Sequence, residues 1–256
     1  MADDKLASSD NKHLEEGSWV LVTGGSRGIG RGIVEKCLSA DHNVVFTYNS
    51  NAELADEIVS SASDSPQHVH AIQADLAEEE GVKRLTAELS SYKNLHAVVH
   101  NAFYAYDSLL TRIDINQAKK LMQLAAWSFL EIAQTVLPVM SSQRRGRFVF
   151  ISSIAAKLAM QGNGSYSASK AAGEAICRQI MVEYARRNIT ANIIRPGYVK
   201  TDLMEQYEKQ PDPGPARSFA EVDDVASLVN YLISSEGIGV NGQTFVVDAG
   251  KSNVSL

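Results

Sequence analysis

Short apolar runs alternate along the chain with longer segments whose apolar residues follow a helical spacing. The run from Trp19 to Val22, for example, precedes the segment 29–38, where apolar side chains recur every third or fourth position, as on one face of a helix. The same alternation continues to the end of the chain. It predicts strands at 19–22, 44–46, 69–74, 97–99, 147–151, 190–194 and 244–247, and helices at 29–38, 52–60, 78–89, 115–140, 168–187 and 222–234.

The alternation of strands and helices predicts an α/β fold. Strands joined by crossover helices lie parallel, and right-handed crossovers place helices on both faces of the sheet. We therefore expect a doubly wound, Rossmann-like fold. Residues 1–16 lack the apolar stretch of a secretory signal and are expected to be a flexible leader. Residues 17–256 should form a single domain, in which the proline-bearing stretch around Pro213 is a loop.

Composition supports a globular protein and argues against several function classes. The chain has 256 residues, of which 45% are hydrophobic, and a net charge of −6, which provides no general field for holding nucleic acid or an anionic membrane surface. Uninterrupted apolar runs fall short of the roughly 18 residues of a membrane span, so a cytoplasmic protein is expected. Cys37 and Cys177 lie on separate predicted helices without metal-ligand spacing, so we expect small buried side chains and no metal site.

A glycine-rich segment, TGGSRGIG, links the first predicted strand to the first predicted helix. Glycines here permit a tight turn, and backbone N–H groups at the start of the helix can approach a pyrophosphate. The alternative is a glycine-rich turn without a ligand. We expect a dinucleotide to contact Thr23, Gly24, Ser26, Arg27, Gly28, Ile29 and Gly30.

The end of the second predicted strand indicates which dinucleotide is bound. An acidic residue there would bind the ribose hydroxyls of NAD, but Tyr48 occupies the place. Asn49, Ser50 and Asn51 follow with neutral donors, and Arg27 can supply a cation for a 2′-phosphate. NADPH is therefore favoured over NADH. Alternatively, Arg27 is a solvated charge and the asparagines make a turn.

The next two predicted strands also end in residues that can contact a cofactor. Ligands of doubly wound sheets bind beyond the carboxyl ends of the strands. An aspartate after a strand is also a common helix cap, so these positions count only as part of the series. They are Asp75, Leu76, Asn101 and Ala102.

A candidate acid-base pair begins the fifth predicted helix. Tyr166 and Lys170 are four residues apart and project from one helical face, while Ser153 ends the preceding strand. The ordinary pKa of a phenol is about 10, and a neighbouring ammonium lowers it towards the range in which proton transfer is efficient. Taken alone, such a pair is usually a surface feature of an amphipathic helix. With the cofactor loop upstream, it predicts a general acid.

These motifs together resemble the short-chain dehydrogenase/reductase family over roughly residues 17–250. The three-residue gap between Gly24 and Gly28 and the closing segment 242–248 are similar to that family, and the best likeness is to β-ketoacyl-acyl-carrier-protein reductases. The resemblance implies catalytic roles for Ser153, Tyr166 and Lys170. In the implied mechanism NADPH delivers hydride, Tyr166 protonates the carbonyl oxygen, Ser153 orients it, and Lys170 holds the nicotinamide ribose. It also implies cofactor contacts from Tyr166, Lys170, Pro196, Gly197, Val199 and Thr201.

Two positions depart from the family's pattern. The family usually has an asparagine in the long middle helix, which supports a water that connects the lysine to solvent. An ungapped count places Ala125 there, so the relay would depend on water, on Gln123 or on Ser128. Phe103 replaces a common glycine. With Tyr104 and Tyr106 it is expected either to form an aromatic wall for an acyl chain or to fill core.

The resemblance also implies partners. Acyl carrier proteins are acidic, and Arg144 and Arg187 match the positions at which carrier-protein reductases present docking arginines. Helix-end arginines are also common surface charges. The segment between Thr201 and Val222, a mobile substrate lid in this family, is short here. A homotetramer built on the helices 115–140 and 166–187 is expected.

The predicted function is NADPH-dependent reduction of a 3-oxoacyl thioester, carried by acyl carrier protein, in fatty acid or polyketide biosynthesis. One alternative is a dehydrogenase for a small alcohol, sugar or steroid. Another is an enoyl-thioester reductase, against which the spacing of Tyr166 and Lys170 argues. From a different class comes a catalytically impaired NADP-binding protein with a regulatory or structural role.

Overall fold

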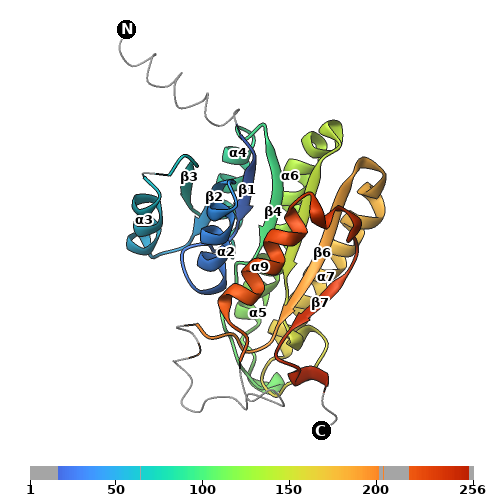
Figure 1. The fold of residues 1–256 in the computed structure, drawn as a ribbon. Helices are drawn as coiled ribbons and strands as arrows, with labels where there is room; N and C mark the ends of the chain where they lie inside the picture. Colours follow the sequence, from blue (N-terminus) through green and yellow to red (C-terminus); the bar gives the residue numbers. More distant parts are fainter. Residues whose placement is uncertain (1–16, 64, 202–203, 205–218, 254–256) are drawn as a thin grey trace.

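A single parallel sheet of seven strands organises the chain (Figure 1). The computed structural model describes residues 17–63, 65–201, 204 and 219–253. The predicted leader and nearly all of the predicted lid lie outside the described residues. The strands follow the order β3-β2-β1-β4-β5-β6-β7. They are β1 (Trp19–Val22), β2 (Asn43–Tyr48), β3 (Val69–Gln73), β4 (Leu95–His100), β5 (Gly146–Ile151), β6 (Ile189–Pro196) and β7 (Thr244–Val247).

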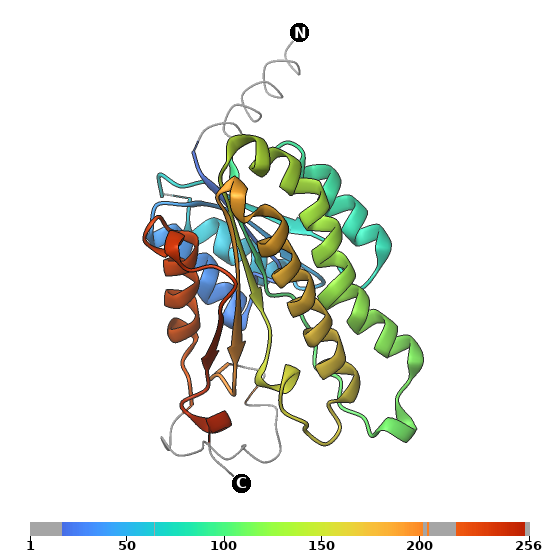
Figure 2. The ribbon, with the colours of Figure 1, turned by 90° about the vertical axis from the view of Figure 1, so that its right-hand side faces the viewer.

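Helices cover both faces of this sheet, which confirms the predicted doubly wound fold (Figure 2). One face carries α4, α5, α6 and α7, and the other carries α2, α3 and α9. Their bounds are α2 (Gly28–Ser39), α3 (Ala52–Ser61), α4 (Glu79–Leu89), α5 (Ile115–Met122), α6 (Ser128–Gln143), α7 (Gly164–Tyr184) and α9 (Val222–Ile233).

Apolar side chains fill both sides of the central strands because helices lie above and below them. In β1, Leu21 packs into the cluster under α4, α6 and α7, while its neighbour Val20 packs into the cluster under α2 and α9. Both are fully buried. This two-sided burial is why the strands are continuous apolar runs and not alternating ones. Cys37 and Cys177 are buried and free.

The long helix predicted at 115–140 is interrupted. A π-helical turn, Gln123–Trp127, separates α5 from α6, and the N–H of Ser128 accordingly bonds to the carbonyl of Gln123, five residues back. The whole segment Ile115–Gln143 is long and apolar enough to cross a membrane by length and composition, but 56% of its most apolar stretch is buried. It therefore has the character of a core helix that covers the sheet.

The sheet topology determines where a ligand can bind. Neighbouring strands all run parallel, so the carboxyl ends of β1 to β6 lie at the same edge. The strand order reverses between β1 and β4, where crossovers leave a crevice. The predicted cofactor loop and Ser153 follow strands that end at this edge.

Candidate active site

The glycine-rich loop forms a tight cradle between β1 and α2. Gly24 and Gly28 have φ values of +67° and +54°, which disfavour any residue with a side chain. A Cβ on Gly30 would overlap the carbonyl oxygen of Gly24, so the loop can fold back on the helix only with glycine there. The N–H of Gly24 donates to the side chain of Thr47 at 3.0 Å. The loop is thus fixed with its helix start open to a ligand.

A cavity of about 270 Å³ extends from this loop along the carboxyl ends of β1 to β4. Arg27, Tyr48, Asn49 and Ser50 line one end, which places the predicted recognition residues for a 2′-phosphate together. Further predicted residues in its lining are Gly24, Ser26, Gly28, Ile29, Gly30, Asp75, Leu76, Asn101, Ala102 and Thr201.

The chemistry of this cavity fits a nicotinamide dinucleotide. Its lining combines a helix start, where N–H groups and the helix dipole favour a phosphate, with the exposed cation of Arg27. Asn101 donates to the carbonyls of Thr23 and Gly24, at 3.1 and 3.0 Å, while its own side-chain oxygen Oδ1 is buried without a partner among the described residues. A donor group of a ligand would satisfy that oxygen.

Several predicted cofactor contacts lie elsewhere. Asn51 is the N-cap of α3, where its side chain accepts a hydrogen bond from the N–H of Leu54, and it does not line the cavity. Its predicted contact with a cofactor stays a prediction. Thr23 is fully buried, and its hydroxyl accepts from the N–H groups of Asn101 and Ala102. Thr23 therefore fixes the start of the glycine-rich loop to the end of β4.

A second cavity, of about 260 Å³, adjoins the first and holds the predicted acid. Tyr166 and Ser153 line it from α7 and from the end of β5. The hydroxyl oxygen of Ser153 accepts from the N–H of Ala155 at 3.1 Å, which leaves its proton available to another acceptor. Gly197 and Val199 also line this cavity, whereas Pro196 is buried at the end of β6 and lines neither.

Lys170 lies behind both cavities. Its side chain is almost completely buried, and its ammonium donates to the carbonyl of Ile151 at 2.8 Å. The same Nζ lies 5.9 Å from the centre of the Tyr166 ring and 5.5 Å from that of Phe103. Burial lowers the pKa of Lys170 to about 7, against a smaller opposing effect of Glu174. A cation at this place favours the phenolate form of a nearby tyrosine.

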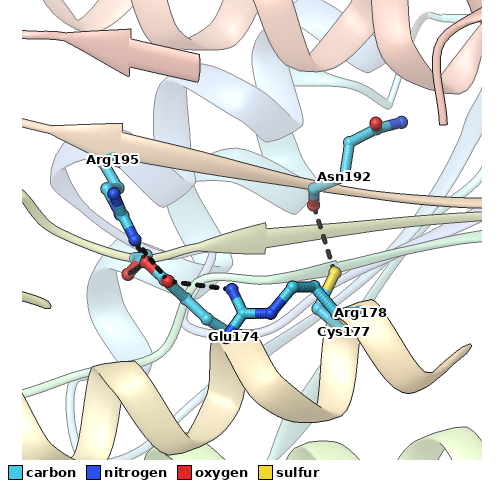
Figure 3. A network of polar contacts seen from close by, with 6 residues as sticks. Glu174, Cys177, Arg178, Asn192 and Arg195 are labelled. Atoms are coloured by element: carbon cyan, nitrogen blue, oxygen red, sulfur yellow. Dashed lines mark hydrogen bonds and ion pairs between the residues drawn. The ribbon is translucent and has the colours of Figure 1, made fainter. Parts of the chain in front are cut away.

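The other polar residues of α7 fix the helix to the sheet (Figure 3). Glu174, one turn after Lys170, accepts two hydrogen bonds of 2.6 Å from Arg195 of β6 and a third from Arg178 at 3.2 Å. Ser152 donates to the same carboxylate at 2.7 Å. Burial acts to raise the pKa of Glu174, but these hydrogen bonds and charges outweigh it and lower the pKa. The carboxylate is thus a fully paired buried anchor.

Gln123 and Ser128, the two side chains suggested as substitutes in the lysine relay, make hydrogen bonds to other groups. Gln123 donates to Glu131 at 3.3 Å, and Ser128 donates to the carbonyl of Leu124 at 2.7 Å. Ala125 is 3% exposed and lies at the centre of the π turn. A Cβ added to Gly173 would come within 2.8 Å of the Ala125 carbonyl, so the turn packs directly on α7.

The aromatic residues after β4 divide between the two expected roles. Phe103 lines both cavities, and Tyr106 lines the second. Tyr104 lines the first cavity and also packs against the core, and its hydroxyl donates to the carbonyl of Gln117 at 3.2 Å. All three residues therefore line a cavity, and Tyr104 fills core as well.

The predicted docking arginines lie far from this site within one chain. Arg144 donates to the carbonyl of Arg186 at 3.2 Å, so Arg144 and Arg187 are neighbours at the end of α7 opposite to Tyr166. A helix of 21 residues is about 30 Å long. A carrier bound at these arginines could serve Tyr166 of the same chain only across that length.

Sequence reasoning did not single out three residues that the structure brings to the site. Thr47 fixes the glycine loop, Glu174 anchors α7, and His100 lies fully buried at the end of β4. Each is a polar residue inside an apolar strand or on the helix face that bears Lys170. A buried polar side chain requires a hydrogen-bond partner. A polar residue inside an apolar strand was therefore the signal in the sequence that could have drawn attention to these positions.

The fold, the cradle and the paired cavities define an oxidoreductase with a nicotinamide cofactor. A family model described as enoyl-(acyl carrier protein) reductase matches residues 24–252. The chain belongs to the short-chain dehydrogenase/reductase family. It is 30% identical over 236 residues to the 3-oxoacyl-[acyl-carrier-protein] reductase FabG of Staphylococcus aureus, covering 90% of this chain and 96% of that protein. It is 28% identical over 234 residues to the 3-oxoacyl-[acyl-carrier-protein] reductase of a Synechocystis strain, covering 90% and 95%.

Solved structures of other oxidoreductases share the fold. A putative gluconate dehydrogenase from Agrobacterium tumefaciens superposes with a TM-score of 0.86 at 23% identity, over 94% of this chain and 99% of that one. L-sorbose reductase from Gluconobacter frateurii, solved with NADPH and L-sorbose, superposes with a TM-score of 0.85 at 21% identity, over 94% and 98%. These similarities support the fold. They do not identify the substrate, which must be inferred from the residues of the site.

Proposed function

We propose that the protein reduces the ketone of a 3-oxoacyl thioester, carried by acyl carrier protein, to the 3-hydroxyacyl thioester with NADPH. The observation that carries the proposal is the position of Tyr166. Together with Ser153 it lines the second cavity, which adjoins the dinucleotide cradle, and the ammonium of buried Lys170 lies close to its ring. When bound in the cradle, NADPH would supply the hydride.

The chain's own residues would manage the proton. Tyr166 donates it to the ketone oxygen, and the Ser153 hydroxyl donates a hydrogen bond that orients the same oxygen. The positively charged form of Lys170 lies close to the Tyr166 ring and favours the phenolate that remains when Tyr166 gives up this proton. Placing both groups on one ketone is the protein's contribution.

The lining of the second cavity supports an acyl substrate. Apolar side chains of Ile154, Met160, Val199 and Met204 form part of it, beside polar side chains that include Asp107, Gln161 and Asn163. Phe103 adds an aromatic face at the entrance to both cavities. An alkyl chain next to the reacting ketone would bury apolar surface here.

The names of the relatives agree with this substrate class. Two relatives that align over most of their length are 3-oxoacyl-[acyl-carrier-protein] reductases, while the matching family description refers to enoyl reduction. Hydride addition to an enoyl thioester also leaves charge on an oxygen that a donor could stabilise, so Tyr166 beside Ser153 does not separate the two reactions. The short spacing of Tyr166 and Lys170 is what favours the ketone.

A carrier-protein substrate bears on the assembly. Because Arg144 and Arg187 lie at the end of α7 opposite to Tyr166, we propose that they would dock a carrier for the site of another copy of the chain. The homotetramer expected from the family is compatible with that arrangement. A cytoplasmic location and a role in fatty acid or polyketide biosynthesis complete the proposal.

The proposal is tested by NADPH oxidation with acetoacetyl and crotonyl groups, each on acyl carrier protein, on coenzyme A and on a small thiol. We expect turnover of acetoacetyl groups, fastest on the carrier protein, and none of crotonyl groups. Turnover of crotonyl without acetoacetyl would contradict ketone reduction. Equal acetoacetyl rates on all three carriers would remove the case for docking at Arg144 and Arg187.

A further inference from the structure

His100 closes strand β4 in the layer between the cofactor loop and α7. It is fully buried and packs against two phenylalanine rings, with ring centres 5.7 Å from Phe150 at an interplanar angle of 8° and 5.1 Å from Phe129 at 30°. Its nitrogen Nδ1 lies 3.3 Å from the hydroxyl of Thr23, and Nε2 lies 3.0 Å from the carbonyl oxygen of Leu124. The reaction proposed above assigns it no role.

The partners determine which nitrogen of His100 carries the proton. The Leu124 carbonyl can only accept, so Nε2 must donate, and Nδ1 of the neutral ring is then an acceptor. Thr23 already accepts from the N–H groups of Asn101 and Ala102, at 3.0 Å each, so its own proton is available for Nδ1. The hydrogen bonds therefore run in one direction, from the end of β4 through Thr23 and His100 to Leu124.

The ring remains neutral at ordinary pH. Burial, assisted by the positive charge of Lys170, lowers the pKa of His100 to about 3. A neutral ring can donate and accept at once, which an imidazolium cannot. The direction of the hydrogen bonds is thus constant over the range in which an enzyme works.

The two ends of this chain of hydrogen bonds belong to different parts of the site. Thr23 leads into the glycine-rich loop, and Leu124 belongs to the π turn Gln123–Trp127. The turn packs on α7 at Gly173, three residues after Lys170. Phe150 contacts both His100 and Lys170, whose Nζ is 5.4 Å from its ring centre. His100 therefore connects the cofactor cradle to the helix that bears the catalytic pair.

We propose that His100 is a positioning residue, which fixes the π turn to the cofactor loop and so holds Lys170 in place beside Tyr166. The Leu124 carbonyl accepts from both His100 and Ser128, so the bent turn is stabilised at that oxygen without any contribution from the side chain of Ala125. The inference rests on the function proposed above. It differs from a general packing role, because it depends on the two ring nitrogens and not only on the ring.

The test compares variants at His100 in the full chain. H100F keeps a flat ring packed against the two phenylalanines but loses both hydrogen bonds. H100Q retains an amide long enough to donate to Leu124. S128A is the matched control, because it removes the other donor to the same carbonyl and leaves the connection to Thr23 intact. The measurements are the pH dependence of acetoacetyl reduction, the Kd of NADPH by its fluorescence, and the Tm.

We expect H100F to move the basic limb of the kcat profile upwards by about one pH unit, because Tyr166 returns towards the ordinary phenol pKa of about 10 when Lys170 is displaced. Its kcat near pH 7 should fall about tenfold, part of the 10²–10⁴ that positioned acid-base groups contribute. NADPH should bind several-fold more weakly. In H100Q the basic limb of the kcat profile should lie within about 0.3 pH unit of its wild-type position. S128A should not move this limb.

A lower Tm in H100F with an unchanged limb and an unchanged Kd for NADPH would overturn the inference and leave His100 a packing residue. If H100F does not fold, H100N takes its place, since its shorter amide cannot reach both partners, and the same shift is required of it. Failure of the proposed function would show differently: wild type itself would then reduce no acetoacetyl thioester.

Discussion

The ammonium of Lys170 lies 5.5 Å from the centre of the Phe103 ring, on the side from which both cavities approach it. Phe103 is 38% exposed, whereas Lys170 is 1% exposed. Phe103 and Tyr166, which both line the second cavity, thus place their rings close to the buried lysine. The low pKa of Lys170 depends mainly on this burial.

The substitution Phe103→Gly should raise the pKa of Lys170 by at least about one unit towards its ordinary value of about 10.4, because water then reaches the ammonium. The lost cation–π contact acts in the opposite direction but is worth only about 0.5–2 kcal/mol, and the rings of Phe150 and Tyr166 remain. NMR titration of labelled lysine side chains measures the shift. Phe103→Leu, which keeps an apolar cover, is the control, and equal pKa values in the two variants would refute the role of the ring.

Lys170 should also make stability depend on pH. Its folded pKa, about 7, is below that of the unfolded chain, so the unfolded state binds more protons between pH 7 and about 10.4. The free energy of unfolding should therefore rise with pH over this window, and the contribution is lost as the pH falls through 7. Urea unfolding at pH 7 and 9.5 measures the slope.

Lys170→Met should abolish this pH dependence. Because it also removes the cost of burying a charged ammonium, it should raise the free energy of unfolding near pH 7 by an amount on the order of 1 kcal/mol or more. Lys119→Met, at an exposed lysine of α5, controls for loss of a charge. An identical pH slope in wild type and Lys170→Met would show that the lysine titrates no differently in the folded protein.

Glu174 allows a comparison between two arginines that contact the same carboxylate. The side chain of Arg195 is 17% exposed and binds Glu174 through two short hydrogen bonds, whereas that of Arg178 is 48% exposed. Arg195→Leu should cost about 3–5 kcal/mol of unfolding free energy, since it leaves a buried carboxylate with only Ser152 and the more exposed Arg178 as partners. Arg178→Leu should cost at most about 1 kcal/mol. Chemical denaturation measures both, and similar losses would mean that burial does not set the strength of these pairs.

Arg27 should determine the choice between the two nicotinamide cofactors. It lines the first cavity with Tyr48, Asn49 and Ser50, and the strand end at Tyr48 carries no acidic residue. Arg27→Ala should weaken NADPH binding about tenfold, since a charge-assisted hydrogen bond to a 2′-phosphate contributes about 1.5–3 kcal/mol, and should change NADH binding less than about twofold. Equal losses for the two cofactors, measured by fluorescence titration, would place the 2′-phosphate elsewhere.

The sequence predicted the order and nature of the strands because their apolar runs are buried on both faces. Strand ends were less predictable: β2 begins at Asn43, whose side chain accepts from the N–H of His68. That contact joins residues distant in the chain. Asn51 is a related case, since a helix cap and a ligand contact can use the same side chain, and only the fold shows that Asn51 caps α3.

Spacing and resemblance were enough to propose the catalytic residues, but their surroundings were not predictable. A π turn adds one residue to a helix without interrupting its apolar pattern, so Gln123–Trp127 could be predicted only as helix. The positions of Phe103 over Lys170 and of His100 between Thr23 and Leu124 depend on contacts between separate elements. No local pattern encodes such contacts.

Tyr166→Phe tests the central claim most directly, because it removes one hydroxyl from the second cavity and leaves the dinucleotide cradle unchanged. The measurements are acetoacetyl reduction at saturating NADPH and, on the same preparation, the Kd of NADPH. We predict that kcat falls at least about 100-fold, as expected for loss of a general acid, while the Kd stays within about twofold of wild type. Retained turnover in a variant that binds NADPH normally would show that another group donates the proton.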